Sequence, residues 1–332
     1  MLKNNNKNIN RDKYIHIIIL GYGNFLFTTQ KCLESLIKEV NQEDVLITVI
    51  DNGSLDNSAK LQKDFLEIYP TINSVYLPQN LGFAGGMNYG ASLVNAEWVI
   101  LMGSDTIFMP GSFAIFYKEL IKTTIPIGIV GPVTNEAGNG QKLAFNGSNA
   151  CQVFQEFKEI IPDCCGLATT IYRADFFCVA IRKKIWDKLN GLSLSYGKGY
   201  YEDFDFCMRA KDLGVRIVML EDVLVYHAGS SSFHLDPQQK ELIKRNKKIF
   251  VKKFPFVQLR HRREDNLQVL KEYLELDSET FYSTGLQSLI KNRLWIAEND
   301  VPRSVFKKYI WQYRVRKIRQ EFVNKNFNDT IN

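Results

Sequence analysis

Residues 14–20 read Tyr14-Ile-His-Ile-Ile-Ile-Leu20, an almost unbroken run of apolar, mostly β-branched side chains. Such a run is typical of a strand that is buried on both faces of a parallel sheet. Further strands are predicted at 45–50, 74–77 and 98–102, with helical patterns between them. Strands that alternate with helices at this pitch predict a doubly wound, mostly parallel α/β sheet.

Each of these strands leads into a polar or glycine-rich loop. The loops cover 21–24, 51–54, 80–86 and 103–105. In open α/β sheets, ligands bind beyond the carboxyl ends of the strands. The loop at 80–86 does not have the G-x-G-x-x-G spacing of dinucleotide-binding proteins, so a nicotinamide cofactor is disfavoured.

The remainder of the chain is predicted to contain loops and short strands at 126–147, a strand and helix over 171–192, and two strands at 215–220 and 223–226. Long basic helices follow Pro237. The sequence therefore predicts a disordered lead-in over 1–12, an α/β domain over 13–236 and a basic helical region over 237–332.

Composition is that of an ordinary globular protein, with 45% hydrophobic and 23% charged residues. No stretch has the roughly 18 uncharged apolar residues of a transmembrane helix. Six cysteines without a C-x-x-C pair indicate free thiols in a reducing cytoplasm. Residues 237–332 hold 21 Lys and Arg against 11 Asp and Glu, which predicts an anionic partner for this region, either a membrane surface or nucleic acid.

The segment from Gly199 to Arg209 combines acids, aromatics and a helical pattern. Glu202 and Asp203 precede apolar residues spaced for one buried helix face. Taken alone, this pattern predicts a capped surface helix on which Asp205 and Arg209 pair on the outer face. The alternative is that Asp203 is an ionised carboxylate that accepts a proton in catalysis.

Two further residues follow strands and carry metal-binding groups. Asp105 is either a turn carboxylate or an oxygen ligand for Mg²⁺ or Mn²⁺, and His227 is either structural or a second ligand. A zinc site from Cys164, Cys165, His227 and His234 is disfavoured because adjacent cysteines are poorly spaced for zinc.

The order of these motifs resembles family 2 glycosyltransferases of the GT-A fold, and is most similar to a bacterial rhamnosyltransferase-like branch that builds surface polysaccharides. The likeness covers about 14–235 and is most specific at 80–90 and 199–214. The segment 292–295, Asn-Arg-Leu-Trp, is also similar to C-terminal helices of that branch.

The resemblance implies roles for individual residues. Asp203 matches the catalytic base, and Glu202 is its neighbour in the motif. Asp105 and His227 match metal and diphosphate contacts. The residues implied to bind the nucleotide-sugar are Gly21, Tyr22, Asp51, Asn52, Asn80, Gly82, Phe83, Ala84, Gly85 and Ser104.

The chain departs from the family pattern at two places. Gly103 stands where the metal motif usually has its first Asp or Asn, and 21–24 reads Gly-Tyr-Gly-Asn where relatives commonly have a Thr/Asn-Tyr-Asn pattern. A divalent cation, Mn²⁺ or Mg²⁺, is expected, with one side-chain contact fewer than in relatives.

The implied reaction is inverting transfer of rhamnose or another hexose from a dTDP- or UDP-sugar to a hydroxyl of a lipid-linked surface glycan. The basic region is then expected to contact the anionic inner face of the cell membrane, not nucleic acid; a helical cap or a homo-oligomer interface is the alternative. Two other functions stay open: a non-catalytic glycan-binding protein with the same fold, and a sugar-nucleotide pyrophosphorylase. The second is disfavoured because 20–27 lacks a Gly-rich loop with Lys or Arg.

Overall fold

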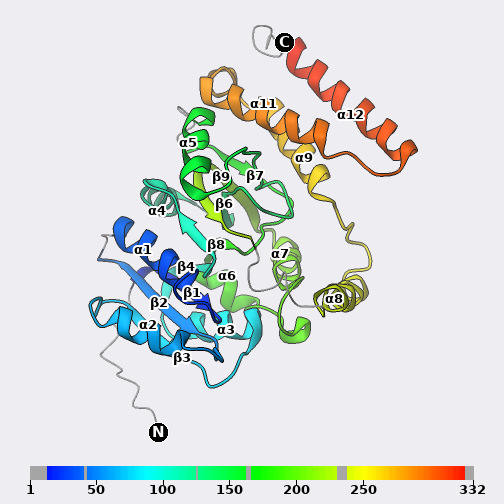
Figure 1. Ribbon diagram of the computed structural model, residues 1–332. Helices are drawn as coiled ribbons and strands as arrows, with labels where there is room; N and C mark the ends of the chain where they lie inside the picture. The colour runs from blue at the N-terminus through cyan, green and yellow to red at the C-terminus, as the bar shows by residue number, and fades with distance from the viewer. Residues whose placement is uncertain (1–12, 41–42, 125, 162–165, 230–237, 326–332) are drawn as a thin grey trace. The chain divides into compact units, whose positions relative to one another are not determined.

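The computed structural model describes residues 13–40, 43–124, 126–161, 166–229 and 238–325 (Figure 1). Its contacts divide the chain into two compact units. The first unit takes the described residues of 1–105, 176–213 and 230–253, and the second takes those of 106–175, 214–229 and 254–332. The predicted lead-in 1–12 and the predicted boundary at 236 lie outside the described residues.

The first unit is organised around five strands in the order β3-β2-β1-β4-β8. The first four are parallel, and β8 is antiparallel to β4. The bounds of these strands are β1 Lys13–Gly21, β2 Val45–Asp51, β3 Asn73–Tyr76, β4 Ala96–Gly103 and β8 Cys178–Arg182. Both faces of β1 and β4 are buried, as the apolar runs predict.

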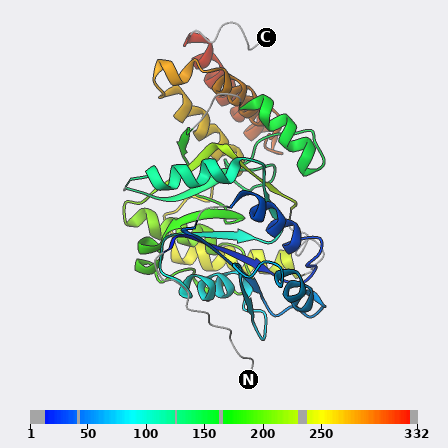
Figure 2. The same cartoon turned by 90° about the vertical axis from the view of Figure 1, so that its left-hand side faces the viewer.

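Helices α1, α2, α3 and α6 of this unit contact the strands, and α8 contacts the short 3-10 helix (Figures 1 and 2). The helices of this unit are α1 Thr29–Glu39, α2 Ser58–Leu66, α3 Gly82–Ser92, α6 Lys183–Lys188, the short 3-10 helix Leu194–Tyr196, α7 Glu202–Asp212 and α8 Gln239–Lys253. The alternation of strand and helix over 13–103 confirms the doubly wound α/β prediction.

Helix α3 differs from the sequence prediction. Gly82 to Gly86 were expected in a glycine-rich loop, and they form the first turn and a half of this helix. The glycines allow close packing of the helix on the sheet: a Cβ on Gly86 would lie 2.5 Å from Leu20, and one on Gly90 would lie 2.5 Å from Ile18. Glycine therefore permits helix–strand contact here, which outweighs its low helix propensity.

The second unit contains β5 Thr106–Phe108, β6 Ile127–Val133, β7 Ala168–Thr170 and β9 Arg216–His227. Strand β9 pairs in parallel with β6 and antiparallel with β5 and β7. The two strands predicted at 215–220 and 223–226 are one continuous strand, because a register shift opposite Pro132 and Val133 accommodates the intervening acids.

Helices of the second unit are α4 Ser112–Lys122, α5 Ala150–Ile160, α9 Arg262–Leu274, α10 Ser278–Phe281, α11 Thr284–Asn299 and α12 Val305–Asn324. Helices α9, α11 and α12 contact one another and lie together in both views (Figures 1 and 2). No helix among the described residues combines the length and apolar character needed to cross a bilayer.

A buried ionic network joins α9 and α11 to β9. The guanidinium of Arg293 lies 2.8 Å from Glu221, and both side chains are fully buried. The hydroxyl of Tyr273 donates to Glu221 and accepts from Arg293. Because unpairing either buried charge would be costly, this network fixes the two helices against the strand. Asn292 adds a reciprocal pair of hydrogen bonds with the backbone of Ala144.

Candidate active site

The predicted ligand-binding loops of the first unit meet at one edge of its sheet. In the strand register Asp51 lies opposite both Gly21 and Tyr76, and Gly103 lies opposite Leu20. The carboxyl ends of the parallel strands are therefore level with one another. This is the edge at which open α/β sheets bind ligands.

Asp51 is almost fully buried and anchors its own loop. Its carboxylate accepts hydrogen bonds from the amide of Ser54 at 3.0 Å and from the hydroxyl of Ser54 at 2.5 Å. The same hydroxyl accepts a hydrogen bond from the amide of Gly23 at 2.7 Å. Asp51 thereby connects the loop after β2 to the loop after β1, where Tyr22 is 40% exposed.

Asn52 is the second anchor at this edge. Its side-chain oxygen accepts a hydrogen bond from the amide of Leu81 at 3.0 Å, and its side-chain nitrogen donates to Asn80 and to the carbonyl of Gly82, both at 3.2 Å. Asn80 in turn accepts from the amide of Gly82 at 2.7 Å. These bonds occupy both ends of the Asn52 amide and hold the start of α3 against the loop after β2.

The start of α3 contacts the loop that leads to α7. Gly82 has a φ of +72°, and a Cβ there would lie 2.5 Å from the carbonyl oxygen of Gly197. The amide of Phe83 donates to the carbonyl of Lys198 at 3.1 Å. Only glycine fits at position 82, since a side chain would meet both backbone strain and a clash.

Two consecutive tyrosines at the start of α7 have left-handed backbone. Tyr200 has a φ of 72° and Tyr201 a φ of 78°. Bulky residues rarely adopt this conformation, which costs on the order of 1–3 kcal/mol per residue and persists only where surrounding contacts enforce it. Strain of this kind is concentrated at functional sites.

Helix α8 provides the contacts that enforce this conformation. The side-chain nitrogen of Asn246, a fully buried residue, donates to the carbonyls of Tyr196 at 2.8 Å, Gly199 at 2.8 Å and Tyr200 at 3.1 Å. The ring of Phe250 lies 5.4 Å from that of Tyr201. One helix of the predicted basic region thus belongs to the first unit and holds the loop 196–201 that precedes α7.

Glu202 and Asp203 begin α7 in different environments. Glu202 is almost fully buried, and its Oε2 has no hydrogen-bond partner among the described residues. Burial, and to a lesser extent the charge of Asp203, raises the pKa of Glu202 to about 8. Asp203 is half-buried and accepts a hydrogen bond from the amide of Phe204 at 2.7 Å. At neutral pH Glu202 is therefore protonated.

The predicted pairing of Asp205 with Arg209 is confirmed at 2.6 Å, but its predicted position on the outer helix face is wrong. Asp205 is fully buried. Its second oxygen also accepts a hydrogen bond from the hydroxyl of Tyr196 at 2.9 Å and pairs with Lys253 of α8 at 2.5 Å. A carboxylate with three such partners is satisfied inside the protein.

The predicted metal ligands are distributed over both units. Ser104 and Asp105 form the turn after β4 in the first unit, and His227 ends β9 in the second, where its Nδ1 lies 3.0 Å from the carbonyl oxygen of Glu136. Within the described part of the chain, no group of three or more His, Cys, Asp or Glu side chains is placed to hold a metal ion. Of the discounted zinc set, Cys164, Cys165 and His234 lie outside the described residues.

Comparison with known families decides what this arrangement is. The sequence model for "Glycosyl transferase family 2" matches residues 17–185, half of the chain. The chain is a family 2 glycosyltransferase.

Individual relatives of this glycosyltransferase are distant. An uncharacterized glycosyltransferase, MG060 of Mycoplasma genitalium, is 30% identical over 93 residues, which is 27% of this chain and 31% of that protein. The minor teichoic acid biosynthesis protein GgaB of Bacillus subtilis is 25% identical over 170 residues, 48% of this chain and 18% of GgaB. The matched segments span less than a third of either relative.

The fold also has a solved counterpart. The mannosyltransferase PcManGT of Pyrobaculum calidifontis, solved in complex with GDP-Man and Mn2+, superposes with a TM-score of 0.50 and 10% identity, covering 96% of this chain and 76% of that one. At this identity the likeness concerns the fold alone, which is the predicted GT-A fold.

Sequence reasoning missed the contribution of α8 to this glycosyltransferase. Asn246 and Phe250 lie in a segment whose net charge suggested only a surface role, and no local pattern marks an asparagine that will cap three carbonyls of a loop nearly fifty residues away. The left-handed tyrosines were likewise missed, because tyrosine has no preference for that conformation.

Proposed function

We propose that this glycosyltransferase inverts the anomeric centre as it transfers a hexose from a nucleoside-diphosphate sugar to a hydroxyl of a lipid-linked cell-surface polymer. The observation that carries the proposal is the pair at the start of α7, where a buried, protonated Glu202 adjoins a half-buried Asp203. The loop before this pair contacts the start of α3.

Asp203 is the proposed general base. Its carboxylate takes the proton of the acceptor hydroxyl while that oxygen forms a bond to the anomeric carbon, and the bond from this carbon to the diphosphate oxygen breaks on the opposite face. The electron pair leaves with the nucleoside diphosphate. The N-terminus of α7 favours the ionised form of Asp203. A protonated Glu202 adds no second negative charge beside it.

The proposed donor site is the edge formed by the loops after β1, β2 and β4 together with the first turn of α3. Asp51 and Tyr22 are assigned to the nucleoside, and the glycine-rich first turn of α3, with the positive end of its helix dipole, is assigned to the diphosphate. A dTDP- or UDP-activated rhamnose or other hexose is the proposed donor. Because GDP-Man occupies the structural counterpart and GgaB is a teichoic acid protein, GDP-sugars and teichoic-acid-like acceptors are also proposed for testing.

A divalent cation fits this site only in part. Asp105 offers one carboxylate, and Gly103 removes the other that the motif usually has. Mg²⁺ is commonly held by one or two carboxylates with substrate phosphates, so Asp105 would hold Mg²⁺ or Mn²⁺ jointly with the donor. A metal contact from His227, which belongs to the other unit, stays a prediction of the family resemblance. The cation would neutralise charge on the departing diphosphate.

The test is release of nucleoside diphosphate from a panel of dTDP-, UDP- and GDP-sugars with glycan acceptors, in Mn²⁺ or EDTA. Asp203→Asn is expected to lower turnover by about 10²- to 10⁴-fold, the usual contribution of a general base. Asp212→Asn, at the exposed far end of the same helix, is the matched control and should retain full turnover.

The rival function, glycan binding without catalysis, predicts donor or acceptor binding with no acceptor-dependent product from any member of the panel. If Asp203→Asn keeps full transfer activity, the proposed mechanism is wrong.

A further inference from the structure

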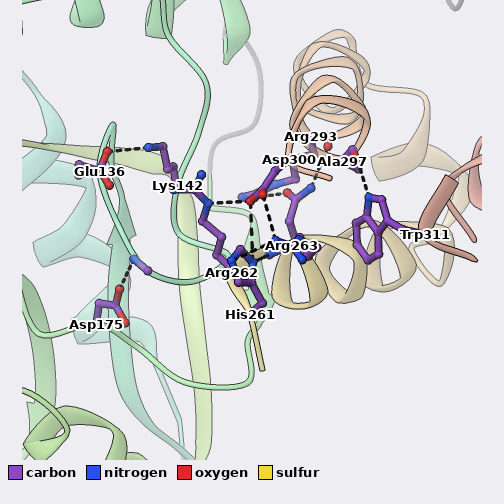
Figure 3. A network of polar contacts seen from close by, with 12 residues as sticks. Glu136, Lys142, Asp175, His261, Arg262, Arg263, Arg293, Ala297, Asp300 and Trp311 are labelled. Carbon is purple, nitrogen blue, oxygen red and sulfur yellow. Dashed lines mark hydrogen bonds and ion pairs between the residues drawn. The ribbon is translucent and has the colours of Figure 1, made fainter. Parts of the chain in front are cut away.

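Helix α12 has two apolar faces, and within the described part of the chain only one of them is buried. Its buried side chains are Trp311, Val315, Ile318 and Phe322. The indole nitrogen of Trp311 donates to the carbonyl of Ala297 in α11 at 2.8 Å (Figure 3). This face holds α12 in the second unit.

The opposite face of α12 is exposed. Its apolar side chains are Val305, Phe306, Tyr309, Ile310 and Tyr313, which are between 43% and 85% exposed. At about 100° per residue these five positions fall within an arc of roughly 140°, opposite the buried face. A contiguous apolar stripe of this kind usually marks an interaction surface.

Positive charge surrounds this stripe. Residues 301–320 contain seven Lys and Arg and no Asp or Glu. Arg314 and Arg319 pair with Glu264 and Glu298. The remaining five cations form no ion pair with any described residue; they are Arg303, Lys307, Lys308, Arg316 and Lys317.

We infer that the exposed face of α12 binds the surface of an anionic membrane, with its aromatic side chains at the level of the headgroups and its lysines and arginines against lipid phosphates. Aromatic residues and cations on one helix are the combination that favours the membrane interface. A second copy of the chain fits less well, because two strongly basic helices would repel each other. A hydrated polyanion, such as a nucleic acid, also fits less well, because it would contact the cations but leave the apolar stripe exposed to water.

This inference goes beyond the proposed function and does not depend on the catalytic assignment. It also narrows the membrane contact predicted for the whole of 237–332 to one helix. Two residues of α8 are not available for a membrane surface: Phe250 packs on Phe204, and Lys253 pairs with Asp205.

The test is co-sedimentation of the full chain with vesicles of phosphatidylcholine alone or with about a third phosphatidylglycerol, at low salt. Each cation near an anionic surface contributes about 1 kcal/mol, so Lys307→Gln/Lys308→Gln is expected to weaken binding by about thirty-fold. Phe306→Ser/Tyr309→Ser should also weaken it. The matched control is Lys247→Gln/Lys248→Gln, which removes two adjacent exposed lysines from α8 and should have little effect.

Three results would overturn the inference: equal loss of binding in the α8 control, equal binding to phosphatidylcholine alone, or unchanged binding in both α12 variants. Light scattering provides a further test, since a dimer that dissociates when Phe306 is replaced would identify a second copy as the occupant. Circular dichroism of the variants reports whether they fold.

Discussion

Helices α8 and α12 have similar sequences in outline and opposite surroundings. Both are basic, both carry aromatic residues, and the net charge of 237–332 joined them in one predicted region. In the structure Phe250 of α8 is fully buried and packs 4.4 Å from Phe204, whereas Phe306 of α12 is 73% exposed. Charge and composition alone therefore do not distinguish a helix that packs against the loop before α7 from a helix whose aromatic side chains are exposed.

The largest expected difference is in the free energy of unfolding when Phe250 of α8 or Phe306 of α12 is replaced by alanine. Phe250→Ala is expected to destabilise the protein by about 3–5 kcal/mol, because it leaves a cavity beside Phe204 and Tyr201. Phe306→Ala, its counterpart on α12, should change stability by no more than about 0.5 kcal/mol. Urea unfolding measures both, and equal values would contradict the contrast between the helices.

The next prediction concerns Glu202, in the turn that α8 holds in place. Its folded pKa of about 8 lies above the ordinary value of 4.5, so the folded protein binds more protons than the unfolded chain between these values. Stability should therefore fall as pH rises from about 5 to 8, by at most about 1.4 kcal/mol per pH unit. Urea midpoints across this range should decline less in Glu202→Gln, and identical slopes would contradict the assignment.

Asn246→Ala removes a donor from three carbonyls of the loop 196–201 that precedes α7. A loss of about 1–3 kcal/mol in stability is expected, because buried acceptors are left unpaired. Turnover should fall more than donor affinity does, since the loop positions Glu202 and Asp203. Gln312→Ala on the exposed side of α12 is the control. Normal turnover in Asn246→Ala would show that the loop keeps its conformation without this brace.

The last prediction contrasts how salt affects the exposed cations of α12 and the ion pair of α8 with the buried Asp205. Raising NaCl from about 0.05 to 0.5 M screens exposed charges and should release the protein from anionic vesicles. The ion pair of Lys253 with the buried carboxylate of Asp205 should be screened much less, so turnover on a soluble acceptor should change little. If vesicle binding and turnover decline together as salt is raised, the predicted difference between α8 and α12 is wrong.

Much of the fold followed from periodicity. The runs at 14–20, 45–50 and 98–102 have no polar alternation, so burial on both faces was predictable, and the helices between them made parallel pairing the simplest connection. The glycines at 82–86 were assigned to a loop because a glycine-rich sequence is compatible both with a loop and with a helix that packs closely on a sheet. The structure distinguishes these two possibilities, because a Cβ on Gly86 or Gly90 would clash with Leu20 or Ile18.

The sequence by itself determined the parallel sheet, the level loops at its edge and the acidic start of α7, because each depends on neighbours in the chain or on strand order. Tertiary structure decided which acids are buried: burial raises the pKa of Glu202 to about 8, and Asp205 is paired with Lys253 of α8 and with Tyr196. It also decided which aromatic faces of the basic helices are covered. Such outcomes depend on contacts between residues tens of positions apart, and no local pattern encodes them.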